Sequence, residues 1–498
     1  MLKNSLYQFE EPISLGFLKS VLSFPERNAV FVAEQYYSYQ RLWELVDFIY
    51  RQIPTDKTYQ TIGIYCNNDI FTYASILAVN LYGAAYVPLN QKFPAVRNKN
   101  YIEQCALKLI LSSSESVELT MISKDVKVIF TKVDNHEITK RPFQFTSYKK
   151  TEQPISYILF TSGTTGIPKG VPVSHSNANY FFNFFLSNYD FNEKDRFLQV
   201  YELTFDGSVF SFFMPLLVGA CCYVLPDEGI KVFKIPEYLK NFNITVVILV
   251  PSVLRYIEQY IDVFLFPALR YSFFAGEALF YELVMRWKKS LPNGNIHNFY
   301  GPTETTILCT RYEFDEKKSN EESINGIVPL GKLFEGMSFM IVDENNQPID
   351  KGELCIAGHQ VISGYLNNQN KDRFFIRDSV RYYKTGDMVS LNKNGNLIFY
   401  GRTDRQVKIN GFRVELGEIE NTISNYTKTN VVVMCNSSEN NMNKLIAYIE
   451  TKTINENSLI EELRTFLPNY MIPQNFIPIE KFALNLNGKI DREKFKNI

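Results

Sequence analysis

Hydrophobic residues along the chain recur with two spacings, one typical of helices and one typical of buried strands. Segment 40–53 predicts a helix because its apolar residues fall on one helical face: Leu42, Leu45, Val46 and Ile49. The continuous apolar runs TIGIYC (61–66) and ITVVILV (244–250) predict strands that are buried on both faces. Because helical and strand patterns alternate through roughly the first four hundred residues, the sequence predicts a layered α/β fold.

The pattern changes after Gly401. There QVKINGFRVELGEIENTI (406–423) precedes two predicted strands, NVVVMC (430–435) and KLIAYIE (444–450), and a helical pattern, SLIEELRTFL (458–467). About ninety residues of this kind suit a compact α+β domain. We therefore expect two domains, a large one over residues 1–403 and a small one over residues 404–498.

Composition excludes several function classes. The chain has 498 residues, of which 45% are hydrophobic and 21% are charged, and its net charge is -1, so no overall field attracts nucleic acid or an anionic membrane. Seven cysteines without a C-x-x-C pair, with four histidines, predict a reducing compartment and no structural zinc. Acidic residues near the N-terminus disfavour a signal peptide, so we expect a cytoplasmic protein.

One apolar segment is long enough to raise a membrane interpretation. GSVFSFFMPLLVGACCYVLP (207–226) carries no charge over twenty residues, which is about the minimum for a bilayer span. However, Pro215 and Gly219 lie near its middle, and basic residues do not flank it. The segment therefore favours a buried helix that runs into a buried strand.

A glycine- and hydroxyl-rich loop follows the apolar run at 157–160. In ILFTSGTTGIPKG (158–170), backbone N–H groups beside glycine, several hydroxyls and one lysine suit an anion. Lys169 lies between Pro168 and Gly170, whereas a Walker A loop places glycine before the lysine and Ser or Thr after it. The segment predicts a phosphate loop of another kind, rather than a flexible turn, with these candidate residues: Thr161, Ser162, Gly163, Thr164, Thr165, Gly166 and Lys169.

Two further loops offer carboxylates. NFYGPTETT (298–306) sets Thr303 beside Glu304, and a hydroxyl beside a carboxylate suits a phosphate held together with Mg²⁺. The alternative is a capping box that opens a helix at Thr303. YYKTGDM (382–388) offers Asp387 in a turn, where it would accept from paired ribose hydroxyls or form an Asx-turn.

In this order the segments resemble the adenylate-forming superfamily, specifically the amino-acid adenylation domains of nonribosomal peptide synthetases and stand-alone relatives such as D-alanine:carrier-protein ligases. The likeness covers almost the whole chain and includes six more segments: LYGAAYVPLNQKFP (81–94), TFDGSVF (204–210), FAGEALF (274–280), GELCIAGHQVISGYLN (352–367), GRTDRQVKINGFRVELGEIE (401–420) and LNGKIDR (486–492). It implies a large αβαβα domain with a small β-barrel, joined by a hinge to a small mobile α+β domain.

The resemblance also implies how ATP and Mg²⁺ are bound. The phosphate loop would close over the β- and γ-phosphates, Thr303 would bond the α-phosphate, and Glu304 would hold the metal. The remaining nucleotide-binding positions divide between adenine and ribose: Asn298, Gly301 and Tyr300 near the base, and Asp387, Arg402 and Phe399 near the sugar. Phe399 stands where relatives often carry tyrosine.

Two lysines would serve two half-reactions. By resemblance, Lys489 enters the site during adenylation, and rotation at the hinge residue Asp404 then replaces it by Lys408 and Gly411. The second step is attack on the acyl-adenylate by a phosphopantetheine thiol. Since six residues follow LNGKIDR, we expect this thiol on a separate carrier protein.

Asp206 suggests the substrate. Relatives that activate amino acids carry an aspartate there for the substrate ammonium group, and a carboxylate among apolar residues needs a cation. Its alternative role is to cap the following helix. The other pocket positions implied by the resemblance are all apolar and favour a small neutral amino acid such as alanine, glycine or proline: Gly207, Phe210, Ile248, Phe273, Ala275, Phe299, Ile307 and Leu308.

Three other functions compete with this prediction. D-alanine ligases usually carry cysteine at the position of Ala275, and acyl-CoA or aryl-CoA ligases generally lack Asp206. A catalytically silent nucleotide-binding relative would not require the whole set of charged candidates, which is Lys169, Glu304, Asp387, Lys408 and Lys489. The sequence therefore favours an amino-acid:carrier-protein ligase.

Overall fold

The computed structural model describes residues 12–55, 58–115, 125–134, 138, 155–163, 167–228, 231–261, 263–369, 371–437, 443–483, 490 and 492–495. The chain divides into two compact units. The first unit consists of Met1–Asn90, Ile102–Leu159 and Gly170–Thr403. The second consists of Gln91–Tyr101, Phe160–Lys169 and Asp404–Ile498, so it includes two short segments that lie far from its main part in the sequence.

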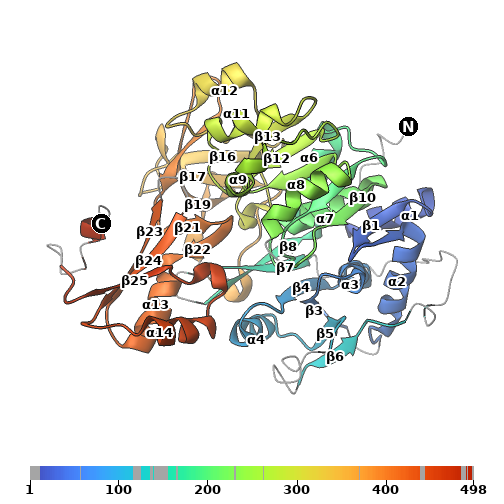
Figure 1. Cartoon of the computed structure of the whole chain (residues 1–498), viewed down its shortest axis with the longest axis horizontal. Helices are drawn as coiled ribbons and strands as arrows, with labels where there is room; N and C mark the ends of the chain where they lie inside the picture. The colour runs from blue at the N-terminus through green and yellow to red at the C-terminus, as the bar shows by residue number, and fades with distance from the viewer. Residues whose placement is uncertain are drawn as a thin grey trace. The chain divides into compact units, whose positions relative to one another are not determined.

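A six-stranded sheet is built mainly from the N-terminal part of the first unit (Figure 1, blue to teal). Its order is β6-β5-β3-β4-β7-β8, with the strands β3 (Thr61–Cys66), β4 (Ala85–Asn90), β5 (Leu109–Ser112), β6 (Lys127–Phe130), β7 (Ile155–Thr161) and β8 (Lys169–Ser174). The helices of this part are α1 (Ser14–Ser23), α2 (Tyr39–Gln52) and α3 (Ile70–Tyr82), whereas α4 (Ala95–Gln104) begins in the second unit. The predicted helix at 40–53 and strand at 61–66 are confirmed.

A nine-stranded sheet has the order β15-β14-β13-β12-β11-β9-β10-β1-β2. Its strands are β1 (Asn28–Val32), β2 (Gln35–Ser38), β9 (Arg196–Gln199), β10 (Cys221–Val224), β11 (Val246–Leu249), β12 (Tyr271–Phe274), β13 (Asn295–Tyr300), β14 (Thr310–Glu313) and β15 (Lys332–Leu333). The six central strands run parallel, and β2, β14 and β15 are antiparallel at the edges.

Helices separate and cover these two sheets. Side chains from both sheets and from α1, α2, α3, α6 (His175–Asn188) and α7 (Gly207–Val218) form one core cluster, so this helical layer is shared. The opposite face of the nine-stranded sheet packs in a second cluster with α8 (Lys231–Asn241), α9 (Pro251–Tyr256), α10 (Glu258–Ile261) and α11 (Tyr281–Lys289). A short helix, α12 (Glu316–Glu322), follows β14. The layered α/β prediction is confirmed.

The charge-free segment at 207–226 has the predicted structure. The helix α7 is interrupted after Val218 by Gly219, whose φ of 76° only glycine adopts readily, and the buried strand β10 follows. Within the described ranges, we find no helix with the length and apolar character that crossing a bilayer requires.

The third sheet of the first unit consists of five antiparallel strands. These are β16 (Met337–Val342), β17 (Lys351–Gly358), β18 (Phe374–Arg377), β19 (Val380–Leu391) and β20 (Leu397–Arg402). Two short 3₁₀ helices, η2 (Leu366–Asn368) and η3 (Lys371–Arg373), lie between β17 and β18. The five strands occupy the region of the expected small β-barrel. Alternation of helices and strands therefore stops near residue 337 rather than near 400, because antiparallel strands need no crossover helix.

The main part of the second unit has its own hydrophobic core. A hairpin of β21 (Gln406–Ile409) and β22 (Phe412–Glu415) turns at Asn410 and Gly411, which both have positive φ, as a two-residue hairpin turn requires. The rest consists of α13 (Leu416–Thr427), β23 (Val431–Ser437), β24 (Asn443–Glu450), α14 (Glu456–Arg464), η4 (Asn469–Met471), β25 (Asn475–Ile479) and η5 (Arg492–Phe495). Buried residues of α13, β23, β24 and α14 pack together.

Candidate active site

Strand register brings four predicted substrate-binding positions together. Ile248 on β11 pairs with Phe273 on β12, and Phe273 pairs with His297 on β13. Phe299 follows two residues after His297, so its side chain points to the same face of the sheet. Ala275 lies just beyond β12 and belongs to the same core cluster. These positions therefore share one surface.

Aromatic rings fill this surface. The ring of Phe273 lies 6.0 Å from that of Phe210 and 5.1 Å from that of Phe299, measured between centroids. Phe185 on α6 adds a further ring, 4.7 Å from Phe210 and 5.4 Å from Phe299. Sequence reasoning did not find Phe185, because its run of phenylalanines at helical spacing indicates only a core-facing helix.

The ring of Tyr201 packs against the start of α7. A Cβ at Gly207 would lie 2.9 Å from the Tyr201 ring, so the absence of a side chain lets that ring pack against the helix. Burial raises the pKa of the Tyr201 hydroxyl, and the negative charge of Asp206 raises it further. Tyr201 is thus a neighbour of Asp206 that the motifs did not reveal.

Asp206 and Thr303 are joined by a hydrogen bond. The Thr303 hydroxyl donates to Asp206 Oδ2 at 2.7 Å across 97 positions of sequence. Asp206 itself has helical backbone angles and makes no side-chain cap bond to the described backbone of α7, so the capping alternative is wrong. At Thr303 the chain forms only the 3₁₀ turn η1 (Thr303–Thr305), which begins after Pro302 without a side-chain cap, so the capping-box alternative is also wrong.

Tyr300, Asp387 and Arg402 form a second polar group. Tyr300 Oη donates to Asp387 Oδ2 at 2.6 Å, and Arg402 donates to Asp387 Oδ1 at 2.5 Å. Burial raises the pKa of Tyr300 well above its ordinary value, and the charge of Asp387 adds to this effect. Asp387 lies within β19, not in a turn as expected from the sequence. The turn signal comes from Gly386, whose φ of 79° accompanies an irregularity in the β17–β19 pairing.

Glu304 is completely buried. Its Oε1 accepts a hydrogen bond from Tyr365 Oη at 2.5 Å, and its backbone carbonyl accepts from the N–H of Ile362 at 3.0 Å. In the described ranges, no three acidic, histidine or cysteine side chains gather into a metal-binding group. One buried carboxylate fits Mg²⁺, which binds through one or two carboxylates together with substrate phosphates.

Of the other nucleotide candidates, Asn298 lies on β13, Gly301 follows that strand directly, and Phe399 lies on β20. Asn298 Nδ2 donates to the carbonyl of Pro329 at 2.9 Å, and its Oδ1 accepts no hydrogen bond from the described residues. Gly301 allows a close backbone approach, since a Cβ there would lie 2.5 Å from the Cα of Leu308. Phe399 is partly buried and packs in the same small core as Tyr300.

In the second unit, the described part of the phosphate loop contacts the β22 strand. Ser162 Oγ donates to the carbonyl of Arg413 at 3.0 Å, and a Cβ at Gly163 would lie 1.9 Å from the carbonyl oxygen of Ile167. Thr161 is half-buried, and Lys169 is only 5% exposed at the start of β8. The predicted residues Thr164, Thr165 and Gly166 lie outside the described residues.

Lys408 and the hinge residue Asp404 also belong to the second unit. Lys408 pairs with Arg413 in the β21–β22 hairpin, and its carbonyl accepts from Asn443 Nδ2 at 2.8 Å. Asp404 Oδ1 accepts from the N–H of Gln406 at 3.2 Å. Lys489 lies outside the described residues.

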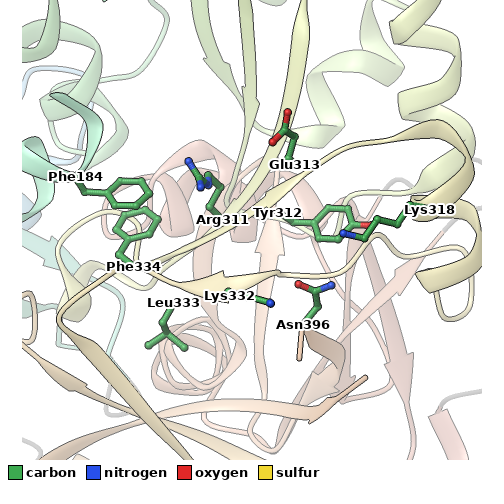
Figure 2. A pocket seen from close by; sticks show the side chains of 9 residues that line it. All are labelled: Phe184, Arg311, Tyr312, Glu313, Lys318, Lys332, Leu333, Phe334 and Asn396. Atoms are coloured by element: carbon green, nitrogen blue, oxygen red, sulfur yellow. The ribbon is translucent and has the colours of Figure 1, made fainter. Parts of the chain in front are cut away.

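A cavity of about 220 Å³ lies next to the aromatic surface in the first unit (Figure 2). Phe184 and Phe334 stack on one side of it with centroids 3.5 Å apart, and Phe334 also approaches Phe299 edge-on at 6.1 Å. The cavity therefore borders the aromatic surface but contains no predicted site residue. Its lining is completed by Arg311, Tyr312, Glu313, Lys318, Lys332, Leu333 and Asn396.

The chain belongs to the AMP-binding enzyme family, because the model of that family matches residues 17–366. It is an adenylate-forming ligase. It is 32% identical to zwittermicin A synthase ZmaJ of Bacillus cereus over 504 residues, covering 96% of this chain and 93% of the relative. It is also 32% identical to the D-alanine--D-alanyl carrier protein ligase of Lactococcus lactis subsp. lactis (strain IL1403), covering 92% and 93% of the two chains.

Some relatives are longer than this chain. Tyrocidine synthase 1 of Brevibacillus parabrevis is 32% identical over 96% of this chain, but the chain spans only 44% of that protein. Among solved structures, the Vibrio cholerae adenylation domain AlmE, in complex with glycyl-adenosine-5'-phosphate, superposes with a TM-score of 0.85. That match has 26% sequence identity and covers 100% of this chain and 99% of AlmE.

Proposed function

We propose that the enzyme activates an amino acid with ATP, releases pyrophosphate, and then transfers the aminoacyl group to the phosphopantetheine thiol of a separate carrier protein. The observation that carries this proposal is the hydrogen bond between Thr303 and Asp206. One partner is the candidate ligand for a substrate ammonium group, and the other is the candidate ligand for the α-phosphate. Their contact would keep the ammonium-bearing end of the amino acid close to the α-phosphate that its carboxylate must attack.

Asp206 separates an amino acid from other carboxylic acids. It is a half-buried carboxylate at the start of an apolar helix, and one of its hydrogen bonds comes from the hydroxyl of Thr303. A substrate ammonium group would bring a positive charge to this carboxylate, whereas a fatty or aromatic acid would bring no cation. This favours amino-acid activation over acyl-CoA or aryl-CoA ligation.

The aromatic surface favours a small side chain. Phe210, Phe273 and Phe299 pack against one another, and Phe185 occupies more of the space beside them. The relative AlmE was solved with a glycyl-adenylate. We therefore propose a small neutral substrate, such as glycine, alanine or proline.

D-Alanine is the second candidate, since a D-alanine--D-alanyl carrier protein ligase matches over nearly its whole length. Against it stands Ala275, where D-alanine ligases usually carry cysteine. Separate exchange assays with glycine, L-alanine, D-alanine and L-proline distinguish these candidates. A preference for D-alanine over glycine and L-alanine would replace our first choice.

Nucleotide binding would use the polar face of β13 and the neighbouring strands. The Asp387 carboxylate would accept from ribose hydroxyls while Arg402 and Tyr300 keep it oriented, and the Asn298 amide and the Tyr300 ring would contact adenine. Gly301 and Phe399 would lie beside the nucleotide. Glu304 would hold Mg²⁺, which supplies positive charge that offsets the phosphate oxygens.

The chain's own donors would stabilise the leaving group. As the substrate carboxylate attacks the α-phosphate, the bond to pyrophosphate breaks and negative charge grows on the departing oxygens. Donors of the phosphate loop and Lys169 aimed there would stabilise the transition state more than the ground state. Thr303 would bond the α-phosphate.

We also propose that residues 404–498 move as one domain about Asp404. Lys489 would act in adenylation, and Lys408 with Gly411 would act in thiol transfer. The exposed faces of one small domain would thus serve two steps in turn.

The test is amino-acid-dependent exchange between labelled pyrophosphate and ATP, measured with a panel of amino acids. The Lys489→Ala variant should lose exchange, whereas Lys408→Ala should retain it and slow transfer to a holo carrier protein. Exchange lost in Lys408→Ala but kept in Lys489→Ala would reverse the assignment of the two lysines. Acceptance of free CoA in place of a carrier would favour a CoA ligase.

A further inference from the structure

A strained turn forms one wall of the candidate substrate pocket. After the η1 turn, Thr306 and Ile307 both have positive φ, 59° and 70°. The N–H of Leu308 donates to the carbonyl of Thr306 at 2.9 Å, which closes a γ-turn around Ile307. This form of γ-turn is rare, and a positive φ is especially unfavourable for a β-branched residue such as isoleucine. Surrounding contacts must therefore hold the turn.

Those contacts come from the side chain of Gln360, which is 2% exposed and lies just after β17. Its Nε2 lies 2.7 Å from the carbonyl oxygen of Leu308, 3.1 Å from that of Thr305 and 3.3 Å from that of Thr306. In return, Thr306 Oγ1 donates to the carbonyl of Gln360 at 2.6 Å. Side chain and backbone of Gln360 thus both hold the turn.

The turn presents two of the predicted substrate-binding side chains, Ile307 and Leu308, each 3% exposed in the main core cluster. Unlike Phe273 or Phe299, neither lies within a strand, so sheet register does not set its position. The bonds of Gln360 act on the backbone immediately before and after Ile307. Their loss would let the turn relax toward ordinary backbone angles and move both side chains.

The same loop also supports Glu304. Two residues after Gln360, the N–H of Ile362 donates to the carbonyl of Glu304, and Tyr365 donates to its carboxylate. These bonds hold the start of segment 304–308, while Gln360 holds its end. Gln360 is therefore the part of the loop that bears on the substrate wall.

We propose that Gln360 is a positioning residue that determines amino-acid specificity, acting through the backbone of Thr305–Leu308 without touching the substrate. The inference rests on the proposed amino-acid activation and names a determinant of its selectivity. A carboxamide is suited to this task, since its NH₂ group supplies two donors to neighbouring carbonyls. An isosteric thioether chain keeps the volume and removes those donors.

The experiment compares Gln360→Met with the wild-type enzyme in pyrophosphate exchange. We expect the KM for the preferred small amino acid to rise about tenfold, as loss of one or two buried hydrogen bonds implies. Selectivity against the next larger amino acid should fall about fivefold, while the KM for ATP changes less than about twofold. The matched control is Gln347→Met, because Gln347 lies exposed in the β16–β17 turn.

A second variant covers the case in which Gln360→Met does not fold, as judged by its unfolding transition. Thr306→Ala removes the single bond from Thr306 Oγ1 to Gln360 and should broaden selectivity in the same direction by a smaller factor. An unchanged amino-acid profile in the folded variants, or a parallel rise in the KM for ATP, would overturn the inference alone. If the wild-type enzyme catalyses no pyrophosphate exchange with any of the amino acids offered, the proposed function is overturned, and this inference with it.

Discussion

The candidate substrate pocket has two walls that are held in different ways. Ile248, Phe273 and Phe299 lie in or along parallel strands, where many backbone hydrogen bonds determine their positions. Ile307 and Leu308 lie on a strained turn that depends on the amide of Gln360. Substitutions in the strand wall should therefore lower the stability of the protein strongly. Substitutions in the turn wall should change amino-acid selectivity with only a small loss of stability.

The largest effect is expected at the strand wall. Phe299→Ala removes a buried ring that touches Phe185, Phe273 and Phe334, and this should lower the free energy of unfolding by about 3 to 5 kcal/mol. Denaturant unfolding of the variant and the wild type measures this loss. A loss below about 1 kcal/mol would mean that the ring is not part of a tightly packed wall.

The proposed ligand of the substrate ammonium group comes next. Asp206→Ala should raise the KM for the amino acid about thirty- to a hundredfold, because the substrate ammonium group loses its partner in a desolvated site. The KM for ATP should change far less. Asp350→Ala, at an exposed position before β17, is the control. Equal increases in both KM values would indicate that Asp206 has a structural role.

The turn wall should respond differently from the strand wall. Ile307→Gly loses a buried side chain but relieves the positive φ, and these terms oppose each other, so we expect a stability loss of about 2 kcal/mol or less. The variant should nevertheless activate larger amino acids in the exchange assay. A stability loss as large as that of Phe299→Ala would remove the distinction between the two walls.

The smallest effect concerns the pH dependence of the strand wall. His297 packs between Tyr189, Phe273 and Phe299, and burial, assisted by the positive charge of Arg311, lowers its pKa to about 3. Because the unfolded chain binds a proton near pH 6.5 and the folded chain does not, stability contributed here is lost as the pH falls below about 6.5.

From pH 7 to pH 5.5 this single group should cost about 1 kcal/mol of unfolding free energy. Unfolding curves at the two pH values measure the change. His297→Phe should remove that share of the acid sensitivity, since the phenyl ring suits its aromatic surroundings and binds no proton. Identical acid sensitivity in the variant and the wild type would show that His297 is not the group responsible.

Local patterns in the sequence predicted many elements correctly but misjudged Asp387. The run at 61–66 is a strand, and the run at 244–250 contains the strand β11, because apolar β-branched residues suit a sheet buried on both faces. Asp387 was expected in a turn, since Gly386 before it is a turn residue. A glycine in an irregular strand looks the same in the sequence, because both structures need its positive φ.

The sequence by itself determined the chemical character of the site: an aspartate among apolar residues, a hydroxyl beside a carboxylate, and the resemblance that orders them. Only the tertiary structure decided that Thr303 bonds Asp206, that Phe185 packs against Phe210, and that Gln360 holds the turn wall. The physical reason is distance along the chain. Hydrogen bonds and ring contacts between residues far apart in the sequence leave no local period, and they exist only after the sheets have brought those residues together.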